Sequence, residues 1–142
     1  MKLSENFSLE EFTASQTATR KNIKEQFNPS QDVINNLKDV CINVLEPIRK
    51  WFNVPIKISS GYRCERLNKA VGGAKNSQHL TGEAIDIDLG RKKNLELLNW
   101  IQKNLEFDQL LNEYPDKDGF PSWVHVSFTK KRKNRKQILV VK

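Results

Sequence analysis

The chain has 142 residues, enough for one ordinary domain with a buried core, and we expect a single domain over residues 1–142. Its 24 Lys and Arg against 17 Asp and Glu give a net charge of +7, which favours a polyanionic partner such as nucleic acid, an anionic membrane surface or an acidic wall polymer. No stretch approaches the ~20 apolar residues of a membrane span, and residues 1–7 lack the apolar core of a secretion signal. We therefore expect synthesis in the cytoplasm, with action at a cell wall only after release through a helper pore.

The first third of the chain has helical patterns. Ser8 and Glu11 have the spacing of a capping box, so we expect a short helix with Ser8 as its N-cap. Between Asp32 and Phe52 the apolar residues recur at helical spacing. This pattern predicts a core helix that Pro47 kinks or divides in two.

Short strands and turns follow in the middle of the chain. Residues 55–59 alternate like a half-buried strand, and Gly61 marks its end. The small, turn-forming residues 70–77 predict a loop that leads to His79. In residues 83–88, polar and apolar side chains alternate, and this predicts a strand.

That strand would divide its side chains between two faces. Asp86 would share one face with Ala84 and Asp88, opposite Ile85 and Ile87. Asp86 is therefore expected to face a cleft, while the isoleucines face the core.

The second half of the chain predicts one helix and three more strands. The helix is expected at residues 94–101, and the strands at 107–113, 122–128 and 137–141, the last at a sheet edge. In the middle strand the period of two places His125 on the same face as Trp123 and Ser127. Helices followed by short antiparallel strands predict an α+β fold, with a small, mostly antiparallel sheet flanked by helices.

Basic residues are densest between Lys130 and Lys136, and no aromatic residue lies among them. Such a run is usually a solvated loop or strand edge, and without aromatic residues it gives no support to the binding of single-stranded nucleic acid by base stacking. Cys41 and Cys64 form no C-x-x-C motif, so ordinary reduced thiols are expected.

His79, Asp86 and His125 make up a set that suits a catalytic zinc ion. Zinc hydrolases commonly bind the metal through three protein side chains and leave the fourth position open for water. His79 and Asp86 are seven residues apart with Gly82 between them, so the chain can turn after His79 and enter the strand of Asp86. His125 would come from a neighbouring strand. A lone His or Asp is more often structural, and the prediction of a zinc site comes from the joint placement of all three.

The chain resembles the zinc D-Ala-D-Ala carboxypeptidases and related peptidoglycan peptidases, which share a fold with the zinc-binding signalling domain of hedgehog proteins. The likeness runs from Phe7 through Val140 and is greatest to the short, single-domain branch found in phages and bacteria. This resemblance implies a zinc site in a cleft on the sheet. The matching segments are Ser77-x-His79-x-x-Gly82-x-Ala84-x-Asp86, Trp123-x-His125-x-Ser127, Ser60-Gly61-Tyr62-Arg63, Leu67-Asn68, Val71-Gly72-Gly73, Asp108-Gln109-Leu110 and Asn134-Arg135.

The resemblance also implies roles for single residues. His79, Asp86 and His125 would bind Zn²⁺, and Arg63 corresponds to the arginine that engages the substrate. A guanidinium suits a peptide carboxylate or a developing oxyanion, because it offers a fixed fork of donors. The alternative for Arg63 is a structural salt bridge. Ser77 would either donate a hydrogen bond to the substrate backbone or cap the His79 loop.

The general base is not fixed by the resemblance. Many relatives place an acidic residue or a His a few positions before the last zinc ligand, where this chain has Ser122. We choose Glu113, at the end of the preceding predicted strand, as the base. Asp108 is the second choice, with a structural role as its alternative, whereas Asp116 and Asp118 fall in a polar turn that we expect to be solvated.

The predicted function is therefore that of a zinc metallopeptidase, which cleaves a peptide bond in the D-amino-acid-containing stem peptides or crossbridges of peptidoglycan. Carboxypeptidase and endolysin-like endopeptidase action both remain open. We expect a monomer whose partner is a peptidoglycan peptide and not nucleic acid. Two alternatives stand beside this hypothesis. A non-catalytic zinc domain of the same fold would keep the three ligands, and a basic nucleic-acid-binding protein would explain the charge but not the placement of the His and Asp residues.

Overall fold

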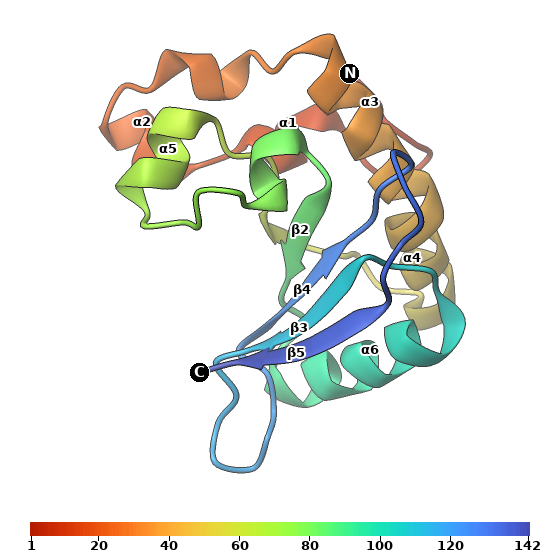
Figure 1. Cartoon of the computed structure of the whole chain (residues 1–142). Helices are drawn as coiled ribbons and strands as arrows, with labels where there is room; N and C mark the ends of the chain where they lie inside the picture. Colours follow the sequence, from red (N-terminus) through yellow and green to blue (C-terminus); the bar gives the residue numbers. More distant parts are fainter.

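Five strands form one sheet in the order β1-β2-β4-β3-β5 (Figure 1). The computed structural model describes all 142 residues. Three of the four strand pairs are antiparallel, and the edge strand β5 runs parallel to β3. The predicted α+β fold with a mostly antiparallel sheet is confirmed. The strands are β1 (Ile58–Ser60), β2 (Ala84–Ile87), β3 (Gln109–Glu113), β4 (Trp123–Ser127) and β5 (Gln137–Val141).

Helices flank this sheet. In Figure 1 the long helical segment α3–α4 and helix α6 lie along one side of it, and α2 and α5 lie together beyond β2. No helix is both long and apolar enough to cross a membrane. The α-helices are α1 (Leu9–Thr13), α2 (Gln16–Arg20), α3 (Gln31–Val40), α4 (Glu46–Phe52), α5 (Glu65–Ala70) and α6 (Arg91–Asn104), and the short irregular helices are η1 (Lys24–Phe27), η2 (Cys41–Leu45) and η3 (Gln78–Thr81).

The core lies between the helices and one face of the sheet. Ile85 and Ile87 of β2 are fully buried and belong to the main cluster of apolar side chains. Asp86, between them, points to the opposite face, as the alternation predicts. The two faces of the sheet thus separate the packing residues from the residues of the candidate site. Further members of the cluster are Leu37, Val40, Leu45, Ile48, Leu97, Ile101, Phe107, Leu110, Val124 and Val126.

Pro47 is accommodated within a continuous helical segment. Helix α3 runs into the π-helical turn η2, and there the Glu46 N–H donates to the carbonyl of Cys41, five residues back. Proline lacks an N–H and its ring clashes with the carbonyl four residues back, so a wider turn just before it relieves both problems. Pro47 then lies in the first turn of α4. The expected core helix is confirmed, with a π turn in place of a break.

Several element boundaries differ from the sequence-based expectations. The strand expected at 55–59 is limited to Ile58–Ser60, an edge strand whose register shifts within those three residues. The strand expected from residue 107 begins at Gln109, and helix α6 begins three residues before the expected start. The capping box is confirmed, because the Ser8 N–H donates to the Glu11 carboxylate at 2.8 Å.

Candidate metal centre

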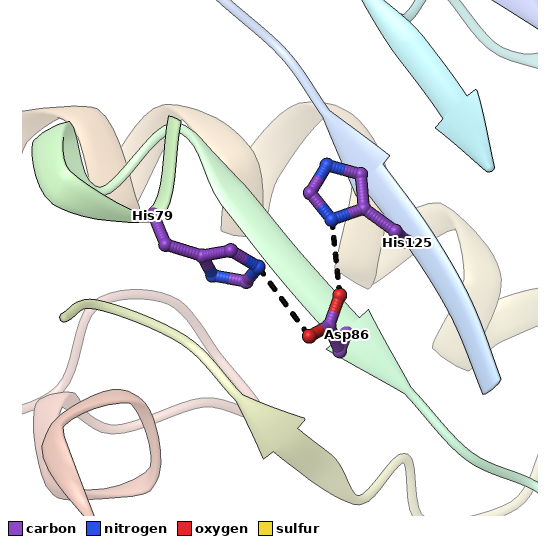
Figure 2. A group of neighbouring side chains, drawn as sticks. All are labelled: His79, Asp86 and His125. Atoms are coloured by element: carbon purple, nitrogen blue, oxygen red, sulfur yellow. Dashed lines mark hydrogen bonds and ion pairs between the residues drawn. The ribbon is translucent and has the colours of Figure 1, made fainter. Parts of the chain in front are cut away.

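The three predicted ligands come from three neighbouring elements. Asp86 in β2 and His125 in β4 are register partners across the antiparallel pair, so their side chains project from the same face. His79 lies in the turn η3, a few residues before β2. Figure 2 shows both imidazole rings directed at the Asp86 carboxylate. The fold therefore brings together the residues that the spacing predicted.

The group is tight and buried. His125 Nδ1 lies 3.0 Å from Asp86 Oδ1, and His79 Nε2 lies 3.3 Å from Asp86 Oδ2. One candidate ligand atom from each residue lies within 4.8 Å of the other two. Each of the three side chains belongs to a residue less than a tenth exposed. This convergence of two imidazoles and one carboxylate is a donor set that zinc prefers.

The hydrogen-bond partner of His79 determines which of its two ring nitrogens carries the proton and which presents a lone pair. Its Nδ1 lies 2.7 Å from the Gly61 carbonyl oxygen, which can only accept, so Nδ1 carries the proton in the neutral ring and Nε2 presents a lone pair. Nε2 is buried and has no hydrogen-bond partner. A lone pair that faces a carboxylate oxygen at 3.3 Å is an unfavourable contact unless a proton or a metal ion lies between the two atoms, and the group could hold a metal ion there.

Two glycines allow this arrangement. A Cβ at Gly61 would lie 2.7 Å from the backbone oxygen of Phe12, so only glycine lets this segment approach helix α1 while its carbonyl faces His79. Gly82 ends the η3 turn at φ +78°, and a Cβ there would lie 2.9 Å from the backbone oxygen of Val33. The predicted turn at Gly82 is thus present.

Asp86 is held in its charged form. Burial by itself would raise the pKa of this carboxyl group, but the neighbouring imidazoles of His125 and His79 outweigh the burial and hold the pKa well below its ordinary value. An ionised Asp86 is the form that a metal ligand requires.

Ser77 caps the turn that carries His79. Its Oγ accepts a hydrogen bond from the His79 N–H at 3.2 Å. This is one of the two roles considered for Ser77. The hydroxyl also lines the cleft described next, so a contact with substrate stays a prediction.

The candidate metal centre opens into a cleft of about 750 Å³. The sheet face is one side of this cleft, and residues 71–79 line another. Arg63 and Glu113, the residues predicted for substrate binding and catalysis, both line it, together with Tyr114, Trp123 and Arg135. Ligands and candidate catalytic residues therefore share one space.

Arg63 has no ionic partner within salt-bridge distance. Its Nη1 donates to Asn68 Oδ1 at 3.0 Å, and its Nε is buried without an acceptor. Burial lowers the pKa of this guanidinium, and the negative charges of Asp86 and Glu113 act in the opposite direction. The salt-bridge alternative for Arg63 therefore finds no partner in the structure, and the guanidinium is available to an anion.

Glu113 offers an unused carboxylate on the same face. It ends β3, two residues after Leu111, which pairs with His125. Its side chain makes no hydrogen bond or ion pair, and burial, followed by the negative charge of Asp86, raises its pKa. Ser122, three residues before His125, has a structural contact, since its Oγ donates to the Tyr114 carbonyl at 2.7 Å.

Asp108, the second choice for the general base, is fully buried, and its contacts are structural. Its carboxylate accepts six hydrogen bonds, which come from Gln78, Arg132 and Arg135. The desolvation of burial is outweighed by these bonds, so the pKa lies far below the ordinary value. With both oxygens occupied, Asp108 cannot accept a proton from water near neutral pH, and its structural alternative describes the observed contacts.

The basic run is an exposed loop between β4 and β5, as its composition predicts, but two of its arginines are anchored to the buried carboxylate of Asp108. We call Asp108, Arg132 and Arg135 the arginine clasp. It fixes the loop between β4 and β5, and through Gln78 Nε2 (3.0 Å from Asp108 Oδ2) it reaches the residue next to His79. No local pattern in the sequence indicates this connection. The only signal for it was that segments containing Asp108 and Arg135 both belong to the family resemblance.

Comparison with known proteins adds one match. The model of the family described as Peptidase M15 matches residues 5–127, a stretch that contains His79, Asp86, His125, Arg63 and Glu113. A search of curated proteins finds no match to the chain.

Proposed function

The chain belongs to the peptidase M15 family of metallopeptidases, and we propose that it is a zinc enzyme that hydrolyses a peptide bond in the stem peptides or crossbridges of peptidoglycan. One observation carries this proposal. The buried His79 Nε2 lone pair faces the Asp86 carboxylate in a cleft that also holds a free carboxylate, Glu113, and an unpaired guanidinium, Arg63.

His79, Asp86 and His125 would hold the zinc ion. When bound there, zinc supplies a Lewis acid for the scissile carbonyl and acidifies a water molecule. The contact of His79 Nδ1 with the Gly61 carbonyl keeps the ring oriented, and Asp86 contributes the single negative charge of the set. The site therefore retains a net positive charge when it is loaded.

Glu113 is proposed as the general base. It would take a proton from the attacking water and then deliver a proton to the leaving amine. Its raised pKa brings the carboxyl group closer to the pH at which it has to exchange protons, and its lack of other partners leaves both oxygens free for this role. A free acid in the cleft supports a catalytic domain over a non-catalytic zinc domain of the same fold.

Arg63 is proposed to bind substrate and to stabilise the oxyanion that develops on the scissile carbonyl. A guanidinium is permanently charged and is a poor neighbour for a metal cation, but it binds a carboxylate or an oxyanion through a fixed pair of donors. The bond from its Nη1 to Asn68 holds the group in place without neutralising it.

Digestion of purified peptidoglycan tests the proposal. Mass spectrometry of the fragments, with and without a chelator and after return of zinc, is expected to show chelator-sensitive cleavage of a peptide bond, and the fragment masses identify that bond. Glu113→Gln is the matched protein control. Stoichiometric zinc without any cleavage would favour the non-catalytic domain. Salt-sensitive DNA binding without zinc would favour the nucleic-acid alternative.

A further inference from the structure

Arg135 enters the cleft with its orientation already fixed. Its Nε and Nη2 donate to the two oxygens of Asp108 at 3.1 and 2.9 Å, and its backbone N–H donates to Oδ1 at 3.0 Å. Because a fork of two parallel bonds sets the plane of a guanidinium, little orientational freedom remains. Arg135 nevertheless lines the same cleft as the metal ligands.

One edge of this guanidinium has no partner in the protein. Nη1 of Arg135 donates to no protein acceptor, and about half of the side chain is exposed. The charges of the clasp do not cancel either, since one carboxylate faces two permanent cations and leaves a net charge of about +1. The clasp thus presents a rigid, unneutralised donor group to the cleft.

Arg132 provides an internal comparison. It binds the same carboxylate through two bonds, at 2.7 and 2.9 Å, and its side chain is equally exposed, but it does not line the cleft. If Asp108 needed cations only for its own neutralisation, the two arginines would be equivalent. Their different positions separate an anchoring role, which both have, from a further role that only Arg135 is placed to perform.

The sheet order separates Arg135 from Arg63. Arg63 follows β1 and Arg135 precedes β5, and these are the two edge strands. The ligands Asp86 and His125 lie on β2 and β4, between those edges. A peptide bound over the metal centre can therefore meet one guanidinium from each side.

We propose that Arg135 is a second anion-binding residue of the cleft, which binds a substrate carboxylate other than the one that Arg63 engages. This inference rests on the proposed peptidase function and deepens it. The preferred substrate is then a peptide that carries a free carboxylate at a distance from the scissile bond. Two sources share this chemistry, namely the C-terminal carboxylate and a side-chain carboxylate of a stem peptide. The arginine that selects it lies outside the residues matched by the family model.

The test uses three synthetic stem peptides with the zinc-loaded protein. One has all carboxyl groups free, one has only the C-terminus amidated, and one has only the side-chain carboxyl groups amidated. The kcat and KM values of the wild type, Arg135→Gln, Arg135→Lys and the matched control Arg132→Gln are compared, and folding is checked by thermal unfolding. A charge-assisted hydrogen bond contributes ~1.5–3 kcal/mol, so Arg135→Gln is expected to raise KM for the free peptide about 10- to 100-fold.

The selectivity pattern decides the outcome. For one of the two amidated peptides, the wild type should show the same rise in KM that Arg135→Gln shows for the free peptide. Arg135→Gln should then show no further rise with that peptide. The group that is amidated in it identifies the carboxylate that Arg135 binds. Arg132→Gln should lower stability but keep the wild-type preference for the free acid. Equal losses for all three peptides in Arg135→Gln, or the same change of preference in Arg132→Gln, would reduce Arg135 to an anchor of Asp108.

Calorimetry keeps this test independent of catalysis. If the wild type cleaves none of the peptides, the proposed function fails, and the binding of the same peptides is measured instead. Tighter binding of the free acid that disappears in Arg135→Gln supports the anion site. Equal affinities, or no binding of any peptide, overturn it.

Discussion

Two of the buried carboxylates of this protein, Asp86 and Asp108, each lie between two basic residues from other parts of the chain. Asp86 lies between His79 and His125, and Asp108 between Arg132 and Arg135. In both cases hydrogen bonds hold the pKa of the carboxyl group below its ordinary value against the effect of burial. The two groups are alike in arrangement, with one carboxylate between two basic side chains, but they differ in what those side chains can do.

The two groups differ in the number of N–H donors that the basic side chains direct at the carboxylate. The guanidiniums of the arginine clasp always carry donors, and together with Gln78 and the backbone N–H of Arg135 they occupy both oxygens of Asp108 with six hydrogen bonds. An imidazole can be neutral and then has a single N–H. His79 donates this N–H, at Nδ1, to the Gly61 carbonyl, so the lone pair of Nε2 faces Asp86. A saturated carboxylate is a structural anchor, and a carboxylate that faces an unpartnered nitrogen is a place for a cation.

The largest expected effect concerns the metal. Replacement of His79, Asp86 or His125 by Ala is expected to reduce bound zinc from about one ion per chain to almost none, because three ligands leave no substitute. Elemental analysis after dialysis measures this. Cys41→Ser and Cys64→Ser are the controls, since both thiols are buried and lie outside the group. Full zinc retention in Asp86→Ala would mean that Asp86, like Asp108, is a structural carboxylate and not a metal ligand.

The second prediction breaks the arginine clasp. Asp108→Asn removes the charge of a buried carboxylate that accepts six hydrogen bonds, and it is expected to cost about 1.5–3 kcal/mol of the free energy of unfolding. Denaturant unfolding of the zinc-free protein measures the loss. Asp86→Asn, tested under the same conditions, should cost much less, because the protein itself leaves the His79 Nε2 atom beside Asp86 without a hydrogen-bond partner. Comparable losses would mean that both carboxylates are structural.

The same substitution has a signature in pH. Because folding lowers the pKa of Asp108, its contribution to stability is complete above the ordinary pKa of about 3.8 and declines as the pH falls below that value. The wild type should therefore lose stability between about pH 4 and 2 more steeply than Asp108→Asn. Parallel acid unfolding curves for the two proteins would argue against an ionised Asp108.

Glu113→Gln tests a carboxylate that belongs to neither pair. We expect zinc to stay bound while kcat falls by ~10²-fold or more, which corresponds to about 2.7 kcal/mol of transition-state stabilisation. The raised pKa of Glu113 also predicts an acidic limb of the pH–rate profile above the ordinary glutamate value of 4.5, and this limb should vanish in the variant. If Glu113→Gln keeps near-normal turnover while Asp116→Asn is inactive and still binds zinc, Asp116 and not Glu113 is the general base.

The sequence predicts the metal centre far better than the clasp. Asp86 and its flanking isoleucines alternate with period two, and this alternation alone assigns the ligand and the core residues to opposite faces. Gly82 marks the turn that returns the chain from His79 to β2. Such signals are local, so they can be interpreted without knowledge of the pairing of the strands.

The clasp depends on long-range pairing that no local pattern specifies. Asp108 and Arg135 are brought together only when β5 pairs in parallel with β3, and before that pairing is known a run of basic residues indicates no more than a solvated loop. The π turn before Pro47 was missed for another reason. Helical periodicity predicts the apolar face of that helix, but it is insensitive to one wider turn that preserves the face.

The smallest expected effect extends the comparison from the carboxylates to their arginines. Arg132 is engaged by Asp108, whereas Arg63 contacts only the neutral Asn68. Arg63→Lys is therefore expected to keep zinc and stability and to lose about tenfold or more in kcat/KM, because an ammonium cannot reproduce the bidentate geometry. Steady-state kinetics and thermal unfolding measure both properties. Arg132→Lys is the matched control, and it should lose stability while kcat/KM changes little. Full activity in Arg63→Lys, or a loss of stability as large as that of Arg132→Lys, would mean that Arg63 has a structural role, as Arg132 does.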